Sequence, residues 1–250
     1  MAIMRVTLRF AGPVLLPEAS PALPDTWLQW AFLRLTGHPD RRPTDPDWVS
    51  DPPLPVARDA ATGLWAVSAL TFPDPGVQTA NRGYRTVWTP ADRLQQQPAA
   101  PLYRLDETGT GPFRAMTYDL TAWYTPRAIF WADVVHLPQL TALLDFLVAL
   151  GVGRKAGDGY GALQSATVDP DPTVASALWT PRGMPRRPIP CRLVSHPVAS
   201  PVLPFQTTGP RWLGAPEPCF CPPIDTWLPR PWRRPDRTAP AADRPSEEDA

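Results

Sequence analysis

Prolines interrupt this sequence so often that only a few of its segments can form regular helices or interior strands. The chain has 37 prolines among 250 residues, and a proline lacks a backbone donor and is excluded from helix interiors and central strands. Pro and Gly together stay below the roughly 25–30% that is typical of low-complexity chains, and 43% of the residues are hydrophobic. The sequence therefore predicts a folded centre with long irregular connections around it.

Hydrophobic periodicity marks the segments that can build this centre. Alternating stretches, or stretches rich in β-branched and aromatic residues, predict strands at residues 5–10, 64–72, 82–88, 113–124, 128–132 and 162–168. Leucines at three- and four-residue steps predict a helix from Leu137 to Leu150. An earlier helix is expected at residues 26–36, with Asp25 as its N-cap and Gly37 at its end.

The core elements follow one another as strand, helix, strand, strand, helix, strand, with hairpin strands inserted in the middle. This is the order of a ferredoxin-like (RRM-type) α+β fold, a four-stranded antiparallel sheet with two helices on one face. We expect this domain to cover residues 1–169, with insertions at 38–62 and 73–125. An irregular extension at 170–237, rich in Pro and Arg, is expected to wrap the core or a partner, and 238–250 to form a disordered acidic tail.

The charge of the chain is balanced overall but not along its length. The formal net charge is zero, which argues against a free-standing nuclease, because domains that bind nucleic acid alone are usually basic. Between Arg182 and Arg237, however, nine arginines accompany three acidic residues. Trp212, Trp227 and Trp232 lie among these arginines, a mixture that either stacks bases and holds phosphates or packs the extension onto protein.

The cysteines predict neither a disulfide framework nor a metal site. Cys219 and Cys221 are too closely spaced for the usual zinc pair, and Cys191 stands alone. The sequence shows no signal peptide, and no apolar run approaches about 18 residues. We therefore expect a cytoplasmic chain with no metal, no cofactor and no membrane contact.

A glycine-rich loop between the second helix and the last strand has the clearest chemical use. Glycine permits positive φ and leaves backbone N–H groups open to an anionic backbone, and two basic side chains add charge at that point. The candidate binding residues of the loop are Gly151, Gly153, Arg154, Lys155, Gly157, Gly159, Tyr160 and Gly161.

Two phosphate-binding motifs are excluded for this loop, and one structural alternative stays open. It is not a Walker loop, because no Gly-Lys-Ser/Thr precedes a helix, and it is not a dinucleotide fingerprint, because it follows a helix and enters a strand. The structural alternative is that the glycines only form a helix C-cap, with Gly151 at its centre, and a turn.

A helix, a basic glycine-rich loop and a final strand in this order resemble the repeat-associated mysterious protein (RAMP) superfamily of CRISPR RNA-binding subunits. Further stretches are similar to one branch, the subunit of type IV CRISPR effector complexes that resembles the Cas proteins binding the 5′ handle of crRNA. These stretches are Pro24–Ala31, Pro53–Pro55 leading into Trp65–Leu70, and Arg187–Pro190. The resemblance extends over residues 5 to about 192, and the order of the motifs carries it.

The resemblance implies a non-catalytic subunit that binds the 5′ part of crRNA and supports the assembly of a ribonucleoprotein defending against foreign DNA. Its partners would be crRNA, a backbone subunit and a large subunit, and it would meet target DNA only through the assembled complex. Besides the loop, Arg186 and Arg187 are expected to contribute to the RNA-binding surface.

Two other functions stay open. The first is a metal-independent crRNA-processing endoribonuclease of the same system, for which His38 would be the general base and Arg41 and Arg42 would bind phosphate. Such nucleases are expected to carry the loop near the C-terminus, whereas roughly 90 residues follow it here. The second is a protein-interaction scaffold that uses the proline-rich extension and never contacts RNA.

Overall fold

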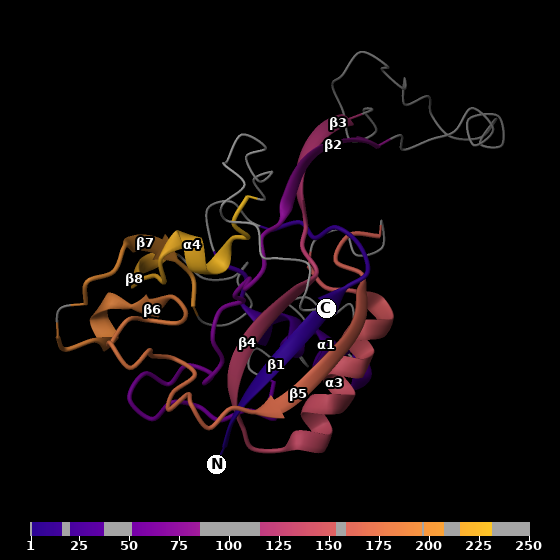
Figure 1. Ribbon diagram of the computed structural model, residues 1–250. Coiled ribbons are helices and arrows are strands. Elements are labelled where there is room, and N and C mark those ends of the chain that lie inside the picture. The colour runs from indigo at the N-terminus through magenta and orange to yellow at the C-terminus, as the bar shows by residue number, and fades with distance from the viewer. Residues whose placement is uncertain are drawn as a thin grey trace, which may run out of the picture.

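The computed structural model describes residues 2–16, 21–37, 52–85, 116–153, 159–196, 198–207 and 216–231, and every structural statement below concerns these residues. They form an α+β fold with three small antiparallel sheets and three α-helices (Figure 1). The sheet that contains the N-terminal strand, called here the main sheet, has the strand order β4–β1–β5.

Alternation of apolar and polar residues places β1 at the centre of the main sheet. The strands are β1 (Ala2–Phe10), β4 (Arg127–Val134) and β5 (Leu163–Pro170). The antiparallel register pairs Val6 with Phe130 on one side and with Val168 on the other. Because paired residues share a face of the sheet, these side chains face the same core. The strands predicted at 5–10, 128–132 and 162–168 are confirmed, with small differences at their ends.

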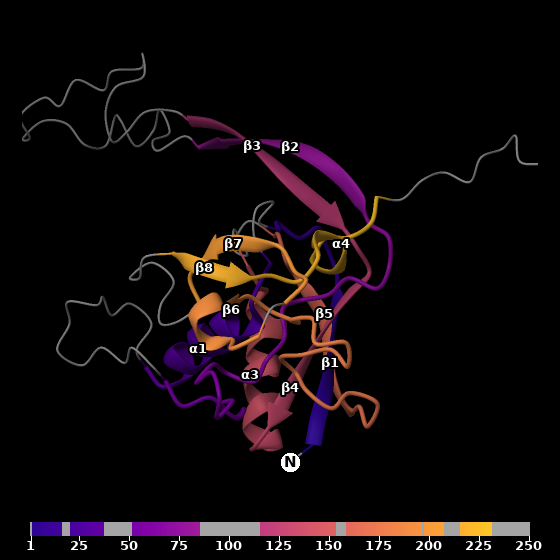
Figure 2. The ribbon, with the colours of Figure 1, turned by 90° about the vertical axis from the view of Figure 1, so that its left-hand side faces the viewer.

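Two helices cover one face of the main sheet, as Figure 2 shows. They are α1 (Pro24–Leu35) and α3 (Leu137–Leu150), and both confirm the sequence-based helices. Their buried leucines join the side chains of β1 and β4 in one core cluster. The ring Nδ1 of His136 accepts a hydrogen bond from the backbone N–H of Gln139 at 3.1 Å and caps α3. Gly37, at a φ of 80°, follows the end of α1.

The stretch predicted as a strand at 64–72 contains only isolated bridges. Val56, Val67 and Thr71 bridge to β4 in the antiparallel sense. Between the last two bridges, the N–H of Ser68 binds the Trp131 carbonyl of β4 at 2.8 Å. The next two donors bind other partners: the N–H of Ala69 binds the Arg186 carbonyl and that of Leu70 binds the Ala22 carbonyl, at 2.8 and 2.9 Å. The contact with β4 is therefore not a continuous ladder, because its register shifts by one residue between the Val67–Ala132 and Thr71–Ile129 bridges.

The strands β2 (Val77–Arg85) and β3 (Met116–Tyr124) form a two-stranded sheet of their own and project from the main sheet (Figure 1). They overlap the strands predicted at 82–88 and 113–124, of which residues 86–88 and 113–115 lie outside the described ranges. At the base of this hairpin, Val14 and Trp123 exchange two backbone hydrogen bonds of 2.9 Å. These bonds anchor the hairpin beside the end of β1.

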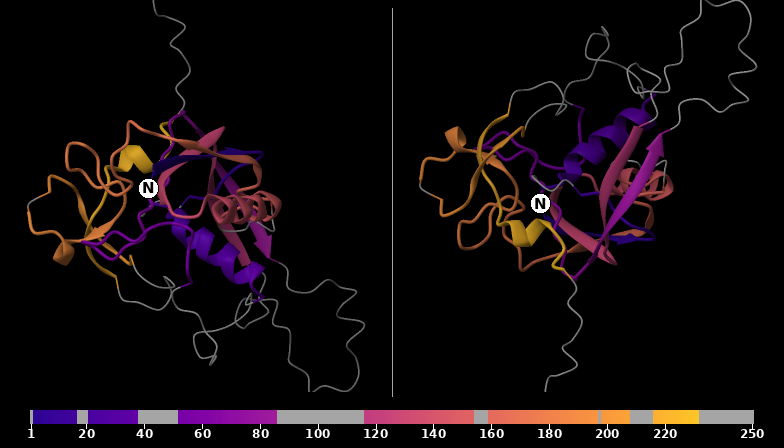
Figure 3. Two further views of the ribbon diagram at one scale, coloured as in Figure 1. Left: turned by 90° about the horizontal axis from the view of Figure 1, so that it is seen from below. Right: turned by 90° about the horizontal axis from the view of Figure 1, so that it is seen from above.

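The extension after β5 was expected to be irregular, but it contains a small sheet of its own. Its strands are β6 (Ile189–Pro190), β7 (Val202–Phe205) and β8 (Glu217–Phe220), in the order β6–β8–β7, with a 3₁₀ turn η2 (Cys191–Leu193) and the short helix α4 (Ile224–Trp227). The extension packs beside the main sheet (Figure 3). Its buried side chains share two clusters with residues 23–69: Leu23, Ala69, Phe205, Cys219 and Cys221 in one, and Leu64, Leu178 and Ile189 in the other.

A buried ion pair joins this extension to the first helix. Arg187 has no exposed surface, and its Nη2 lies 3.0 Å from Oδ2 of Asp25, which is 5% exposed. The Nη1 of Arg187 donates to the carbonyl oxygens of Trp65 and Val67 at 2.9 and 3.1 Å. Asp25 lies inside α1, whose N-cap is Leu23 without a side-chain cap, so the prediction that Asp25 caps the helix is wrong. Its carboxylate is used instead by a residue 162 positions away.

Breaking this pair on one side should destabilise the whole fold. We expect Arg187→Met to lower the free energy of unfolding by about 3–5 kcal/mol, because the Asp25 carboxylate would stay buried without a counter-charge. The double variant Asp25→Leu with Arg187→Met should lose clearly less than the sum of the single variants, since both charges are then gone. Urea unfolding of the chain measures both effects.

The exposed pair between Arg192 and Glu217 supplies the matched control. Its nitrogen and oxygen are 2.7 Å apart, but the two side chains are 62% and 27% exposed. Arg192→Met should therefore cost no more than about 1 kcal/mol. An Arg187→Met variant that unfolds at the same urea concentration as Arg192→Met would contradict the structural role given to the buried pair.

Candidate functional site

The glycine-rich loop lies where β1 ends and the β2–β3 hairpin begins. Residues 151–153 and 159–161 are described, whereas Arg154, Lys155 and Gly157 lie outside the described residues. Gly151, Gly153, Gly159 and Gly161 all have positive φ, between 67° and 87°. This backbone region is strained for residues with a side chain, so the backbone conformation explains why glycine occupies these four positions.

Two of these glycines close the base of the loop. The N–H of Gly161 donates to the Pro13 carbonyl at 2.7 Å, and its own carbonyl accepts from the N–H of Val152 at 2.9 Å. A Cβ on Gly161 would meet the Val152 carbonyl oxygen at 1.9 Å. Gly151 ends α3 through a hydrogen bond from its N–H to the Leu147 carbonyl, at 2.8 Å. Both glycines are buried. At these two positions the structural alternative, a cap and a turn, accounts for the glycine.

The other two described glycines are open to solvent. Gly153 and Gly159 are exposed. A Cβ on Gly159 would meet nothing within 4 Å, and one on Gly153 would meet only the Leu15 carbonyl oxygen at 3.9 Å. Tyr160, which follows Gly159, is half-buried. A ligand backbone can therefore approach the chain at Gly153 and Gly159, and Arg154 and Lys155 lie between them in the sequence.

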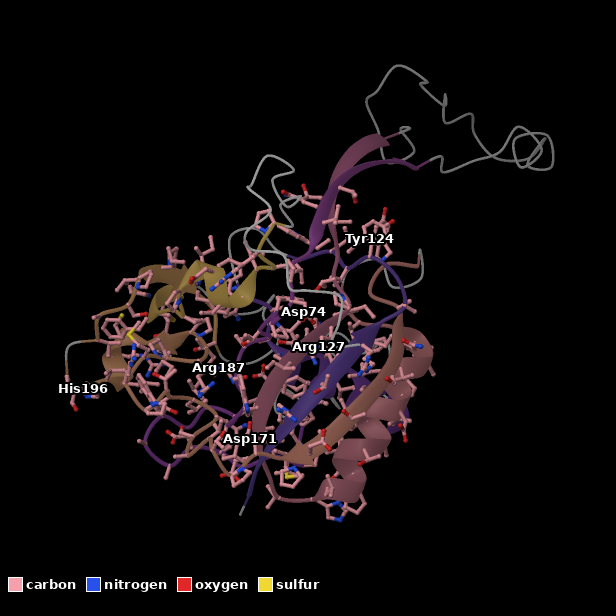
Figure 4. All side chains as sticks on the ribbon, viewed as in Figure 1. Asp74, Tyr124, Arg127, Asp171, Arg187 and His196 are labelled. Atoms are coloured by element: carbon pink, nitrogen blue, oxygen red, sulfur yellow. The ribbon has the colours of Figure 1, made fainter. Side chains whose placement is uncertain are left out.

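Several side chains near this loop were not singled out from the sequence. Tyr124, at the base of the hairpin, is 48% exposed. Arg127 begins β4 and forms an ion pair of 2.8 Å with Asp74. Figure 4 labels these two residues and Tyr124. Arg9 is exposed and pairs directly with Arg127 in the sheet register. Only the pairing of β1 with β4 brings these residues together, so no local motif could have indicated them.

The two arginines predicted for the RNA surface have different surroundings. Arg187 is fully buried and bound to Asp25, so its side chain has no surface for RNA, and its proposed RNA contact is withdrawn. Arg186 is half-buried, and its guanidinium carbon lies 4.4 Å from the centre of the Trp131 ring. Burial lowers the pKa of Arg186, whereas the negative charge of Asp171 raises it by less. An arginine nevertheless stays charged at any physiological pH.

Asp171 helps to fix the indole on which Arg186 stacks. Its Oδ2 accepts a hydrogen bond from Nε1 of Trp131 at 2.9 Å, and its Oδ1 accepts from Oγ1 of Thr173. These side-chain hydrogen bonds, that of Thr173 first, lower the pKa of Asp171. The carboxylate is therefore ionised at neutral pH and holds Trp131 in place beneath Arg186.

The candidate catalytic residues His38, Arg41 and Arg42 lie outside the described residues. Of the described histidines, His136 caps a helix and the ring centre of His196 lies 6.3 Å from that of Trp179. Within the described ranges, no group of three or more His, Cys, Asp or Glu residues could hold a metal ion. In the same ranges no helix is long and apolar enough to cross a membrane.

Two of the three cysteine thiols of the extension are protected by burial. Burial raises the pKa of Cys219 to about 12 and that of Cys221 to about 11. Both side chains are buried, whereas Cys191 is partly exposed. Since the thiolate is the reactive form, Cys219 and Cys221 are chemically inert at neutral pH.

No protein-family model matches the chain, and no curated protein matches its sequence. The resemblance to CRISPR RNA-binding subunits therefore stays a prediction from the sequence motifs.

The two classes of loop glycine should respond differently to alanine. We expect Gly159→Ala to cost about 1–2 kcal/mol of unfolding free energy, because only the positive φ opposes it. Gly161→Ala should cost clearly more, because its Cβ also collides with the Val152 carbonyl. Thermal unfolding of both variants measures the difference. Equal losses of stability would show that the base of the loop is not closed as described.

Thiol reactivity should separate the three cysteines. In the folded chain at pH 8, Cys191 should react with a disulfide reagent first, and Cys219 and Cys221 should react only as fast as the fold opens. The time course of the reaction checks this, with chain unfolded in urea as the reference in which all three react together. If all three thiols react equally fast in the folded chain, the burial of Cys219 and Cys221 is contradicted.

Proposed function

We propose that this chain is a non-catalytic, RNA-binding subunit of a type IV CRISPR ribonucleoprotein, and that its glycine-rich loop holds the 5′ part of crRNA. The observation that carries the proposal is that the described glycines of the loop fall into a buried pair and an exposed pair. Buried Gly151 and Gly161 fix its base, while Gly153 and Gly159 are exposed, and the basic residues Arg154 and Lys155 lie between these two in the sequence. A fixed base with an open backbone and positive charge is what phosphate binding requires.

The fold supports this proposal through the order of its elements. The sequence β1, α1, an edge segment, β4, α3, β5 has two helices on one face of an antiparallel sheet in which β1 is central. We propose that it is a ferredoxin-like arrangement in which residues 56–71 take the place of the fourth strand. The β2–β3 hairpin is then an insertion between that segment and β4.

The three motifs of the resemblance meet at one point of the structure. Asp25 comes from the first motif, the carbonyls of Trp65 and Val67 from the second, and Arg187 from the third. Stretches more than 100 residues apart are thus joined by a single buried interaction. This interaction gives a physical reason for their occurrence together, and so it supports the resemblance more than any one motif does.

Binding in this proposal is electrostatic and does not depend on base sequence. Loop N–H groups and the two basic side chains would hold phosphates of single-stranded RNA, while backbone and large subunits of the complex would bind elsewhere on the chain. Target DNA would be recognised by base pairing with crRNA in the assembled particle. The chain would act in the cytoplasm, where crRNA is made.

The loop charges should determine both the affinity and its salt dependence. We expect Arg154→Ala with Lys155→Ala to weaken binding to the cognate repeat RNA and to reduce the slope of log K against log salt by up to about 0.7 for each phosphate that is no longer bound. Fluorescence anisotropy over a range of salt concentrations measures both. The control is Arg34→Ala with Arg182→Ala, which removes the same charge from two exposed sites away from the loop.

The same RNA, recovered after incubation without metal, tests the rival activity. An intact RNA bound less tightly by the loop variant supports the binding subunit. Cleavage at one site that is abolished by changing Arg41 or Arg42 to Ala would favour the processing endoribonuclease. Wild-type affinity and slope in a folded loop variant would remove the loop from the RNA site.

A further inference from the structure

The face of the main sheet opposite the helices, called here the open face, carries no helix among the described residues and has a regular arrangement of side chains. At its β4 edge, Arg186 of the extension stacks on Trp131. Three rows of paired residues run across β4, β1 and β5 on this open face. The rows are Arg127–Arg9–Ser165, Ile129–Thr7–Thr167 and Trp131–Arg5–Asp169. The helices lie behind the sheet in the view of Figure 1. No helix therefore covers these rows within the described part of the chain.

Two arginines on the central strand are available on this open face. Arg5 and Arg9 are exposed, and neither has an ion-pair partner among the described residues. They are four residues apart on one side of β1, about 13 Å at the rise of an extended strand. This distance is several times the roughly 3.4 Å step of a stacked nucleic-acid strand. One ligand that contacts both must be extended.

The row of Arg9 lies at the end of the sheet where the glycine-rich loop is attached. The N–H of Ala11, two residues after Arg9, donates to the carbonyl of Ala162 at 2.9 Å. Ala162 directly follows Gly161, the base of the loop. A strand of RNA held by the loop can therefore continue onto the open face at Arg9 without crossing another element of the described structure.

The acidic groups of the open face are mostly engaged. Asp74 is paired with Arg127, and Asp171 accepts hydrogen bonds from Trp131 and Thr173. The charge of Arg5 also contributes to lowering the pKa of Asp171, so Arg5 is partly compensated. Asp169 lies across from Arg5 in the register and is the exposed carboxylate of these rows. Positive charge free for a ligand is thus greatest at Arg9 and decreases toward Arg5, which gives the open face a direction away from the loop.

We propose that single-stranded RNA leaving the glycine-rich loop runs along β1 across this open face, with its phosphates contacting Arg9 and then Arg5. The threonines of the middle row, Thr7 and Thr167, supply hydroxyl groups that can bond to RNA 2′-hydroxyls between those phosphates. This inference rests on the proposed function, and it extends the binding site from one loop to one face of the sheet.

RNA length distinguishes the open face from the loop. Single-stranded oligouridylates of about 5 and about 16 nucleotides are titrated with the chain over a range of salt concentrations. For the wild-type chain, the slope of log K against log salt should be larger with the long RNA. Arg5→Ala with Arg9→Ala should remove this difference, a decrease of up to about 1.4 in slope for two phosphates. Arg5→Lys with Arg9→Lys should restore most of it.

Each outcome decides one of the two proposals. The Arg34→Ala, Arg182→Ala variant removes equal charge elsewhere and should keep the wild-type difference. A folded Arg5→Ala, Arg9→Ala variant with the wild-type slope on the long RNA overturns the path across the open face and leaves the loop site standing. If the Arg5→Ala, Arg9→Ala variant binds RNA as the wild type does but no longer copurifies with protein subunits, the open face is a protein interface and the RNA path is overturned. A wild-type chain that binds neither RNA overturns the proposed function itself.

Discussion

The buried contact between Arg187 and Asp25 is the interaction on which the rest of the architecture depends. Removing a guanidinium and a carboxylate from water costs several kcal/mol per ion, and their attraction alone does not reliably offset it. Here two backbone carbonyls, those of Trp65 and Val67, accept further hydrogen bonds from the guanidinium. Asp25 Oδ1 and Arg187 Nε nevertheless have no hydrogen-bond partner among the described residues, so the pair contributes more to uniqueness than to stability. The observed placement of the extension satisfies these bonded groups together.

This placement also explains the irregular edge of the main sheet. A regular edge strand beside β4 would present a row of unpaired backbone groups to solvent, which favours association with other strands. Residues 56–71 instead divide their hydrogen bonds among β4, residue 22 and the extension. The Ser68 hydroxyl also accepts a hydrogen bond from the backbone N–H of Trp131, at 2.9 Å. The extension therefore protects one edge of the sheet while leaving the open face uncovered by helices.

Local patterns predicted the elements that depend on local forces. Leucine periodicity predicted α3, alternation located β1 and a short apolar run located β4, because each of these elements buries side chains against a single core. The role of Asp25 was predicted wrongly because it is not local. An acidic residue at a helix start fits the capping rule, and nothing nearby in the sequence reveals that an arginine 162 residues later takes its carboxylate. The strand expected at 64–72 failed likewise, since the residues have strand propensity but their hydrogen-bond partners are non-local.

The glycine-rich loop also combines features that local sequence predicts with features that only the tertiary structure reveals. From the sequence its glycines are equivalent, and all four described ones do adopt positive φ. The structure separates them by surroundings: a Cβ on Gly161 would collide with the Val152 carbonyl, whereas one on Gly159 would meet nothing within 4 Å. The first kind of glycine builds the turn, and the second leaves the backbone accessible. The alternation of β1 continues this logic beyond the loop. The alternation that buries Val6 and Leu8 also places Arg5 and Arg9 on the opposite face, so core packing itself orients the charges that a ligand could use.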